Sequence, residues 1–249
     1  MVKTAIQLYT LDGFDVSDAT KVEIAAETTV DGIEIVFDGI PSDETVKTIR
    51  ETALEVAGLS IGIDDLDGSI DKIVTTCEIL DCDTVVLGYL DESYYESAQT
   101  TGETADLLST YGTRFEKHGL QFLYHVHRHE FDSLGDRTHF DLLREEVNES
   151  VMFELDLGWI GVAGTDPYAV IEEVGTQAAS VHLKDMNFET EQFVNLGDGD
   201  LDIERAARTA IEAGVDWLIY EHENPKDPVE SVVTGASKLH KFKQTNLSQ

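Results

Sequence analysis

The sequence predicts an α/β fold, and more narrowly a single (β/α)₈ barrel over residues 1–249. Its length suits one barrel of about 250 residues, and 41% of its residues are hydrophobic, enough for a large core. Strand and helix signals alternate eight times, and no linker rich in glycine, serine or proline divides the chain. An open doubly wound sheet would carry a phosphate-binding glycine fingerprint after its first strand, and residues 9–14 have none. A closed barrel is therefore the better prediction.

Eight short apolar runs are the expected strands. Most are continuous rather than alternating, as in parallel strands whose two faces are both covered. In chain order, the runs cover residues 5–9, 32–37, 59–63, 84–89, 120–126, 151–155, 179–183 and 217–220.

Amphipathic stretches between these runs are the expected helices. Residues 42–57, 69–80 and 203–213 repeat their apolar residues at helical spacing. Pro167 and Pro228 each follow an aspartate, and proline in that place is typical of the first turn of a helix. We expect helices to begin at both prolines.

The charge of the chain is strongly negative. Fifty acidic residues against 17 basic ones give a formal net charge of −33. The acids are spread along the sequence rather than gathered in one tail, which favours a solvated surface suited to a salt-loving, halophilic host over a site for a basic partner. The charge also argues against a nucleic-acid partner, because phosphate binding needs a basic surface.

The sequence gives no sign of export or of a membrane partner. It has no charged-then-apolar leader and no apolar run of about 20 residues. Its two cysteines, Cys77 and Cys82, do not form a disulfide framework or a zinc-binding pattern. We expect a cytoplasmic protein, and a homo-oligomer is an open alternative to a monomer.

Three polar residues each come at the end of their own expected strand: Asp156, His182 and Glu221. In a (β/α)₈ barrel these strand ends form the functional face, so the three side chains are expected side by side. Two carboxylates and an imidazole suit Mn²⁺, Mg²⁺, Co²⁺ or Zn²⁺, whereas two carboxylates without a cation would repel each other. Any one of them alone could be a buried salt-bridge residue, but three in register favour a divalent metal site.

The fourth metal ligand is expected from the segment after residue 124. Glu130 is our prediction, because a third carboxylate suits a hard divalent ion, and His127 is the alternative. Strand alternation places His125 and His127 on one side, where both are candidate substrate-binding residues. We expect His129 and His139 to be exposed or structural.

Three further residues are candidates for contact with a substrate. Lys184 lies two residues after His182, so it points to the same side and could stabilise a developing enediolate. Its alternative role is a salt bridge to Asp185 or a neighbouring acid. Glu34 is either a substrate ligand or a residue of the barrel interior, and Trp159 either forms an apolar wall against a substrate ring or simply packs.

Taken together, these motifs resemble the xylose isomerase-like superfamily of TIM barrels. That superfamily contains the sugar phosphate isomerase/epimerase group and is related to inosose dehydratases and AP endonuclease family 2. Residues 124–131 are similar to its Tyr-His-Asn-His-x-x-Glu-Phe segment, with Val126 in place of the asparagine. The other matching segments are 6–10, 32–34, 156–159, 163–167, 182–185 and 196–199.

This resemblance implies a carbohydrate substrate and a metal held by residues of strands five to eight. It implies a metal-dependent isomerase or epimerase in carbohydrate metabolism, in which Glu130 or Glu221 moves a proton while also contacting the metal. A lyase or dehydratase acting on a keto-polyol or keto-sugar is the first alternative. An AP endonuclease-like repair enzyme is disfavoured by the charge and by Trp159, which stands where the resemblance places a histidine.

Overall fold

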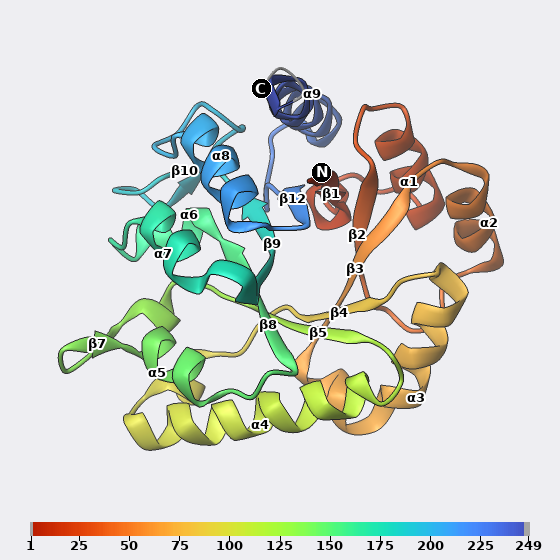
Figure 1. Cartoon of the computed structure of the whole chain (residues 1–249). Helices are drawn as coiled ribbons and strands as arrows, with labels where there is room; N and C mark the ends of the chain where they lie inside the picture. Colours follow the sequence, from red (N-terminus) through yellow and green to blue (C-terminus); the bar gives the residue numbers. More distant parts are fainter. Residues whose placement is uncertain (1, 247–249) are drawn as a thin grey trace.

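The eight apolar runs form one closed parallel barrel, as the sequence predicted, with helices packed around it (Figure 1). The computed structural model describes residues 2–246, apart from the side chains at positions 67, 69 and 243–246. Around the barrel the strands run in the order β1-β12-β9-β8-β5-β4-β3-β2. Their bounds are β1 (Lys3–Gln7), β2 (Gly32–Val36), β3 (Glu55–Ile61), β4 (Thr84–Leu87), β5 (Gln121–His125), β8 (Val151–Asp156), β9 (Ala178–Leu183) and β12 (Trp217–Tyr220).

Each gap between barrel strands contains helix. The α-helices are α1 (Asp18–Ala26), α2 (Asp43–Glu51), α3 (Ile63–Leu80), α4 (Ala98–Glu116), α5 (His139–Glu146), α6 (Leu157–Val162), α7 (Pro167–Val174), α8 (Ile203–Ala213) and α9 (Pro228–Asn246). The helix starts expected at Pro167 and Pro228 are confirmed, and α8 has the predicted bounds. In the part of the chain that the structure describes, no helix is long and apolar enough to cross a membrane.

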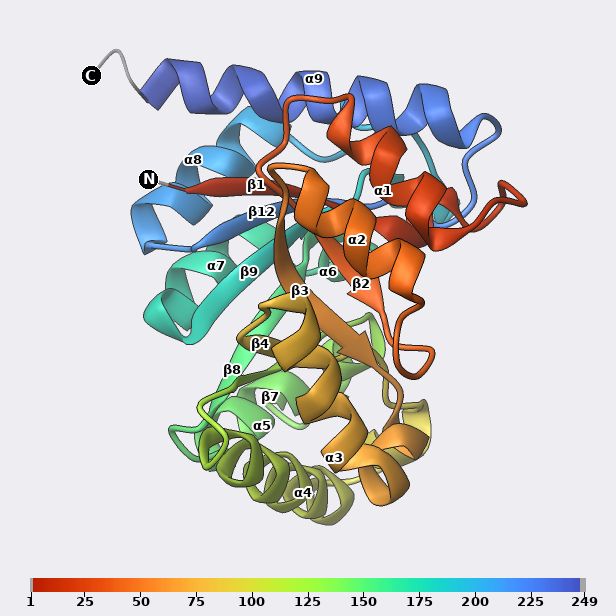
Figure 2. The same cartoon turned by 90° about the vertical axis from the view of Figure 1, so that its right-hand side faces the viewer.

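Short 3₁₀ helices and two small hairpins lie in the segments that connect the barrel strands and helices. They are the 3₁₀ helices η1 (Leu8–Leu11), η2 (Glu92–Tyr95), η3 (His129–Phe131) and η4 (Gly175–Gln177), with the hairpins β6 (Ser133–Leu134)–β7 (Arg137–Thr138) and β10 (Met186–Asn187)–β11 (Gln192–Phe193). Helix α9 packs on β1, η1 and β12, and Figure 2 shows it lying across the barrel beside the N-terminal strand.

Two helix boundaries differ from the prediction. Helix α2 ends at Glu51, and residues predicted as its last turns begin strand β3 instead. The apolar residues there fit both the helical and the strand period, so their spacing did not separate the two. Helix α3 begins at Ile63 rather than at residue 69, because the Asp65 carboxylate accepts the Gly62 amide at 2.9 Å and caps the helix.

The inside of the barrel is filled by apolar side chains below a polar layer. Apart from the main core between strands and helices, two small clusters stand alone: Ala5, Ala57 and Ile219, and Val86, Leu123 and Ala179. By strand alternation, Leu123 and Ile219 point the same way as His125 and Glu221, which follow them by two residues. The polar layer therefore lies at the C-terminal ends of the strands, and these two apolar clusters fill the barrel beneath it.

Candidate active site and metal centre

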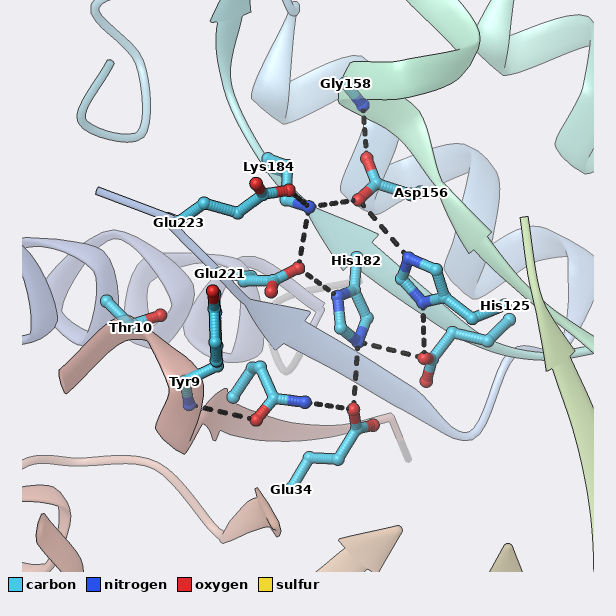
Figure 3. Close-up of polar contacts among 12 residues, drawn as sticks. Tyr9, Thr10, Glu34, His125, Asp156, Gly158, His182, Lys184, Glu221 and Glu223 are labelled. Carbon is cyan, nitrogen blue, oxygen red and sulfur yellow. Dashed lines mark hydrogen bonds and ion pairs between the residues drawn. The ribbon is translucent and has the colours of Figure 1, made fainter. Parts of the chain in front are cut away.

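Four buried side chains converge where β5, β8, β9 and β12 end (Figure 3). One ligand atom from each of His125, Asp156, His182 and Glu221 lies within 4.8 Å of the others. The sheet register accounts for this, because Asp156 pairs with His182 across β8 and β9. The structure thus brings together three of the four predicted metal ligands. The fourth member of the group is His125, which the sequence suggested as a substrate-binding residue.

Glu130 lies outside this group. It belongs to η3, beyond the end of β5, and both of its carboxylate oxygens have protein partners. Tyr124 donates its hydroxyl to Oε1, and the His127 amide donates to Oε2 at 3.0 Å. The chain turns after β5, which directs Glu130 into this buried network and away from the four converging groups.

The remaining histidines of this region separate into two kinds. His127 is half-buried beside the pocket, 4.8 Å from His125 and 5.0 Å from Tyr89 between ring centroids. Burial and then the positive charges of His125 and Lys184 hold the pKa of His127 well below its usual value. His129 and His139 have the structural role that was one of the two expected for them. The His129 ring lies 2.8 Å from the Leu90 carbonyl, and the His139 ring lies 2.7 Å from the Thr101 hydroxyl.

Lys184 is fully buried among carboxylates. Its Nζ lies 2.8 Å from Asp156 Oδ2, Glu221 Oε2 and Glu223 Oε1. Burial alone would lower the Lys184 pKa, but the three carboxylates outweigh it and hold the pKa well above its usual value. The alternative partner Asp185 is engaged elsewhere, since its carboxylate accepts the backbone amides of the loop 197–201.

Glu34 lines the same pocket as Lys184, and Figure 3 shows the two at opposite ends of the contact network. Gln7 donates to its Oε1, and its Oε2 is buried without a hydrogen-bond partner among the described residues. Burial and then the nearby Glu154 carboxylate raise the Glu34 pKa to about 7. Gly58 of β3 packs beside it: a Cβ there would lie 3.4 Å from Oε2 and 3.1 Å from Val86 Cγ2. Glu34 is therefore both a residue of the barrel interior and part of the pocket wall.

These groups line a pocket of about 450 Å³, a volume suited to a small molecule. Its lining contains all the predicted substrate-binding residues, namely Glu34, His125, His127 and Trp159, and also Lys184 and Glu221. A larger cavity of about 930 Å³ opens at the N-terminal end of the barrel, where Lys3 and Trp217 line it, and it contains none of these residues. The C-terminal location agrees with where barrels of this kind carry out their chemistry.

The converging groups fit a divalent cation. Asp156 uses Oδ1 to cap α6 through the Gly158 and Trp159 amides, which directs Oδ2 into the group. That Oδ2 is buried and lies 2.8 Å from Lys184 Nζ, yet it makes no hydrogen bond of standard geometry. Two carboxylates and two imidazoles suit Zn²⁺, Mn²⁺ or Co²⁺.

Sequence reasoning missed two carboxylates at this site. Glu154 lies two residues before Asp156 and points the same way, and Glu223 follows Glu221 at the same spacing. An acid inside a buried apolar strand was the available signal for Glu154, as it was for Glu34. Spacing alone did not indicate how deep in the barrel such an acid would lie.

A model of the xylose isomerase-like TIM barrel family matches residues 22–242. This chain belongs to that family. No curated protein sequence matches the chain. The family assignment agrees with the closed barrel and with the resemblance seen in the sequence motifs.

Solved structures with the same fold include sugar isomerases or epimerases and a dehydratase. A sugar phosphate isomerase/epimerase from Parabacteroides distasonis superposes with a TM-score of 0.78 at 18% identity, covering 96% of this chain and 94% of its own. A probable 3-DHS dehydratase from Bacillus anthracis gives 0.77 at 14% identity, covering 96% and 99%. A D-allulose 3-epimerase from a Methylomonas species gives 0.72 at 12% identity, covering 97% and 98%. At these identities the likeness shows the shared fold.

Proposed function

We propose that this family member is a metal-dependent isomerase or epimerase acting on a sugar or sugar derivative. The observation that carries the proposal is the buried convergence of His125, Asp156, His182 and Glu221 beneath a small-molecule pocket. Family membership and the sugar isomerases and epimerases among the structural neighbours support it. Of the four candidate ions, Mn²⁺, Co²⁺ or Zn²⁺ suits the two imidazoles better than Mg²⁺.

The protein's own groups fit proton transfer next to a carbonyl. A divalent ion, when bound, supplies Lewis-acid polarisation of a carbonyl and the hydroxyl beside it. Lys184 holds a positive charge at the pocket, where it would stabilise negative charge that develops on a substrate oxygen. We assign the proton transfer to Glu34, because its Oε2 is unpartnered at the pocket, whereas Glu221 Oε2 faces His182 and Lys184.

The pocket favours an uncharged substrate. Among the residues that the structure describes, Lys184 is the one lysine or arginine in the pocket lining, and three carboxylates already surround its ammonium. A phosphate group needs cations or a cradle of amides, so this lining would repel it. The lining also includes Tyr9, Val36 and Tyr89, each at least 42% exposed, which suits the apolar face of a sugar ring. We therefore infer an unphosphorylated ketose, polyol ketone or keto-sugar.

Solvent deuterium exchange tests both parts of this proposal. The Mn²⁺-loaded protein is incubated in D₂O with ketoses, inososes and 3-keto-sugars, each beside a phosphorylated counterpart. We expect deuterium in the neutral substrates, no incorporation with His182→Ala, and normal incorporation with the exposed control variant Glu204→Gln. Exchange confined to the phosphorylated compounds would overturn the neutral substrate, and no exchange with any compound would count against the isomerase itself.

A dehydratase is the alternative that the same site allows. An enediolate can regain its proton or expel a neighbouring hydroxyl, and one structural neighbour is a probable 3-DHS dehydratase. The exchange reaction separates the two when its products are identified. An isomeric sugar supports our proposal, and loss of water supports the alternative.

A further inference from the structure

One buried carboxylate contacts both imidazoles of the site. Glu154 of β8 has no exposed surface, and its Oε2 lies 2.7 Å from His125 Nδ1 and 3.1 Å from His182 Nε2. Its other oxygen accepts the Ser180 hydroxyl at 2.6 Å. Glu154 is outside the pocket lining and outside the four-residue group. With Glu34 and His182 it forms a second buried group, whose ligand atoms also lie within 4.8 Å of one another.

The two rings face Glu154 with different nitrogens. His125 turns Nδ1 to Glu154, which leaves Nε2 facing Asp156 Oδ2 at 3.6 Å. His182 turns Nε2 to Glu154, which leaves Nδ1 facing Glu221 Oε2 at 2.9 Å. Figure 3 shows the His125 ring beside Asp156 and the His182 ring between Glu221 and Glu34. The two nitrogens that do not face Glu154, Nε2 of His125 and Nδ1 of His182, therefore face the carboxylates of the four-residue group.

Strand register makes this double contact possible. The pairing of β8 with β9 shifts between Phe153 and Glu154, and after the shift Glu154 lies opposite Ser180 while Asp156 lies opposite His182. On its other side Glu154 pairs with His125 of β5. One side chain therefore reaches the rings of both neighbouring strands, while Ser180 fixes its second oxygen.

We propose that Glu154 is a positioning residue that orients His125 and His182 together. It would hold His125 with its proton on Nδ1 and His182 with its proton on Nε2, so that the opposite nitrogens are free to bind a cation. The proposal rests on the proposed metal site. A carboxylate behind a ligand imidazole also makes the other nitrogen a stronger donor, and here one carboxylate serves two rings.

Glu34 is the competing partner for His182. Its Oε1 lies 3.5 Å from Nε2, further than the Glu154 oxygen, and it already accepts a hydrogen bond from Gln7. His182 Nε2 makes no hydrogen bond of standard geometry among the described residues, so the shorter contact decides our assignment. Any test must therefore compare the two glutamates.

The experiment measures Zn²⁺ and Mn²⁺ affinity by calorimetry for Glu154→Leu, Glu154→Gln and the control Glu34→Gln. Leucine removes both acceptors at similar volume, and glutamine keeps a carbonyl acceptor without the charge. Loss of such an outer partner typically weakens metal binding about 10–100-fold. We expect a loss in that range for Glu154→Leu, a smaller loss for Glu154→Gln, and a change within about threefold for Glu34→Gln. Folding of each variant is checked by circular dichroism.

Nitrogen-15 NMR of the histidine rings gives a readout independent of activity. In the Zn²⁺-loaded wild type we expect the remaining ring proton on Nδ1 of His125 and on Nε2 of His182. In the metal-free protein these two N–H groups should exchange slowly with water, and both should lose that protection in Glu154→Leu, or in Glu154→Gln if the leucine variant does not fold.

Two results would overturn the proposal. One is wild-type metal affinity with unchanged ring signals in both folded Glu154 variants, and the other is an equal loss in Glu34→Gln. If wild-type protein binds no divalent ion, the proposed metal site fails, whereas the metal-free ring signals still report whether Glu154 holds both histidines.

Discussion

The Lys184 ammonium lies 2.8 Å from Oδ2 of Asp156, the oxygen that also faces His125. A permanent cation thus sits beside the four groups proposed to hold the metal. It balances carboxylates that would otherwise repel one another in the buried site. The same ammonium lines the pocket, so it can act on a substrate without itself being a ligand.

Replacing Lys184 should separate metal binding from turnover. In Lys184→Met the four metal-binding groups remain, so we expect metal content equal to the wild type. Turnover should fall about 100-fold or more, the usual effect of removing a group that stabilises developing negative charge. Metal analysis and deuterium exchange on the same preparation measure the two effects, and full exchange activity would show that Lys184 has no catalytic role.

His182→Ala should abolish tight metal binding and leave the barrel folded. The ring contributes one of four converging groups, and its neighbours Glu154 and Glu221 would face a cavity. Metal content per chain after dialysis measures the effect. His127→Ala is the matched control, because His127 lies outside the group, and an unchanged metal content in His182→Ala would refute the assignment.

Glu130→Gln should lower stability rather than metal affinity. Its carboxylate accepts the Tyr124 hydroxyl and the His127 amide, and losing or weakening buried hydrogen bonds of this kind costs about 1–3 kcal/mol in the free energy of unfolding. Metal affinity should stay within about threefold of the wild type. A residue outside the metal ligands affects binding mainly by contacting a ligand, and neither partner of Glu130 is in the four-residue group. Urea unfolding and calorimetry measure both quantities. A loss of metal binding as large as in His125→Ala would restore Glu130 as a ligand.

Metal binding should release protons at pH 7. Burial alone would lower the His125 pKa, but hydrogen bonds to Asp156 and Glu154 raise it to about 9, and His182 is raised well above its usual value. The His125 ring is therefore charged below about pH 9, and the raised pKa of His182 keeps its ring charged at pH 7. Each ring must lose a proton to bind a cation. We expect about two protons released, and affinity that falls up to about 100-fold for each unit of decreasing pH. Calorimetry in buffers of different ionisation enthalpy counts them, and a count near zero would contradict the charged state.

Salt should stabilise the fold. A net charge of −33 repels itself most strongly when the screening length is long. We expect the unfolding temperature to rise steadily as NaCl increases from about 0.1 M to 2 M, where the screening length falls to a few ångströms. Thermal scans at fixed protein concentration test this, with a flat or falling profile arguing against a salt-adapted surface.

The sequence alone determined the barrel and the strands that supply the site. Continuous apolar runs separated by capped helices allow few other arrangements, and polar residues at strand ends must meet at one rim once the barrel closes. Asp156, His182 and Glu221 could therefore be grouped from their positions.

Only the tertiary structure decided which residue completes the group and what lies beneath it. Alternation along a strand gives the side on which a residue points, but not its depth in the barrel or the turn of the chain beyond the strand. That turn takes Glu130 away and leaves His125, and the register shift between β8 and β9 places Glu154 under both rings. Both features depend on how neighbouring strands pair and on the path of the chain beyond them, and the spacing of residues within one strand does not determine either.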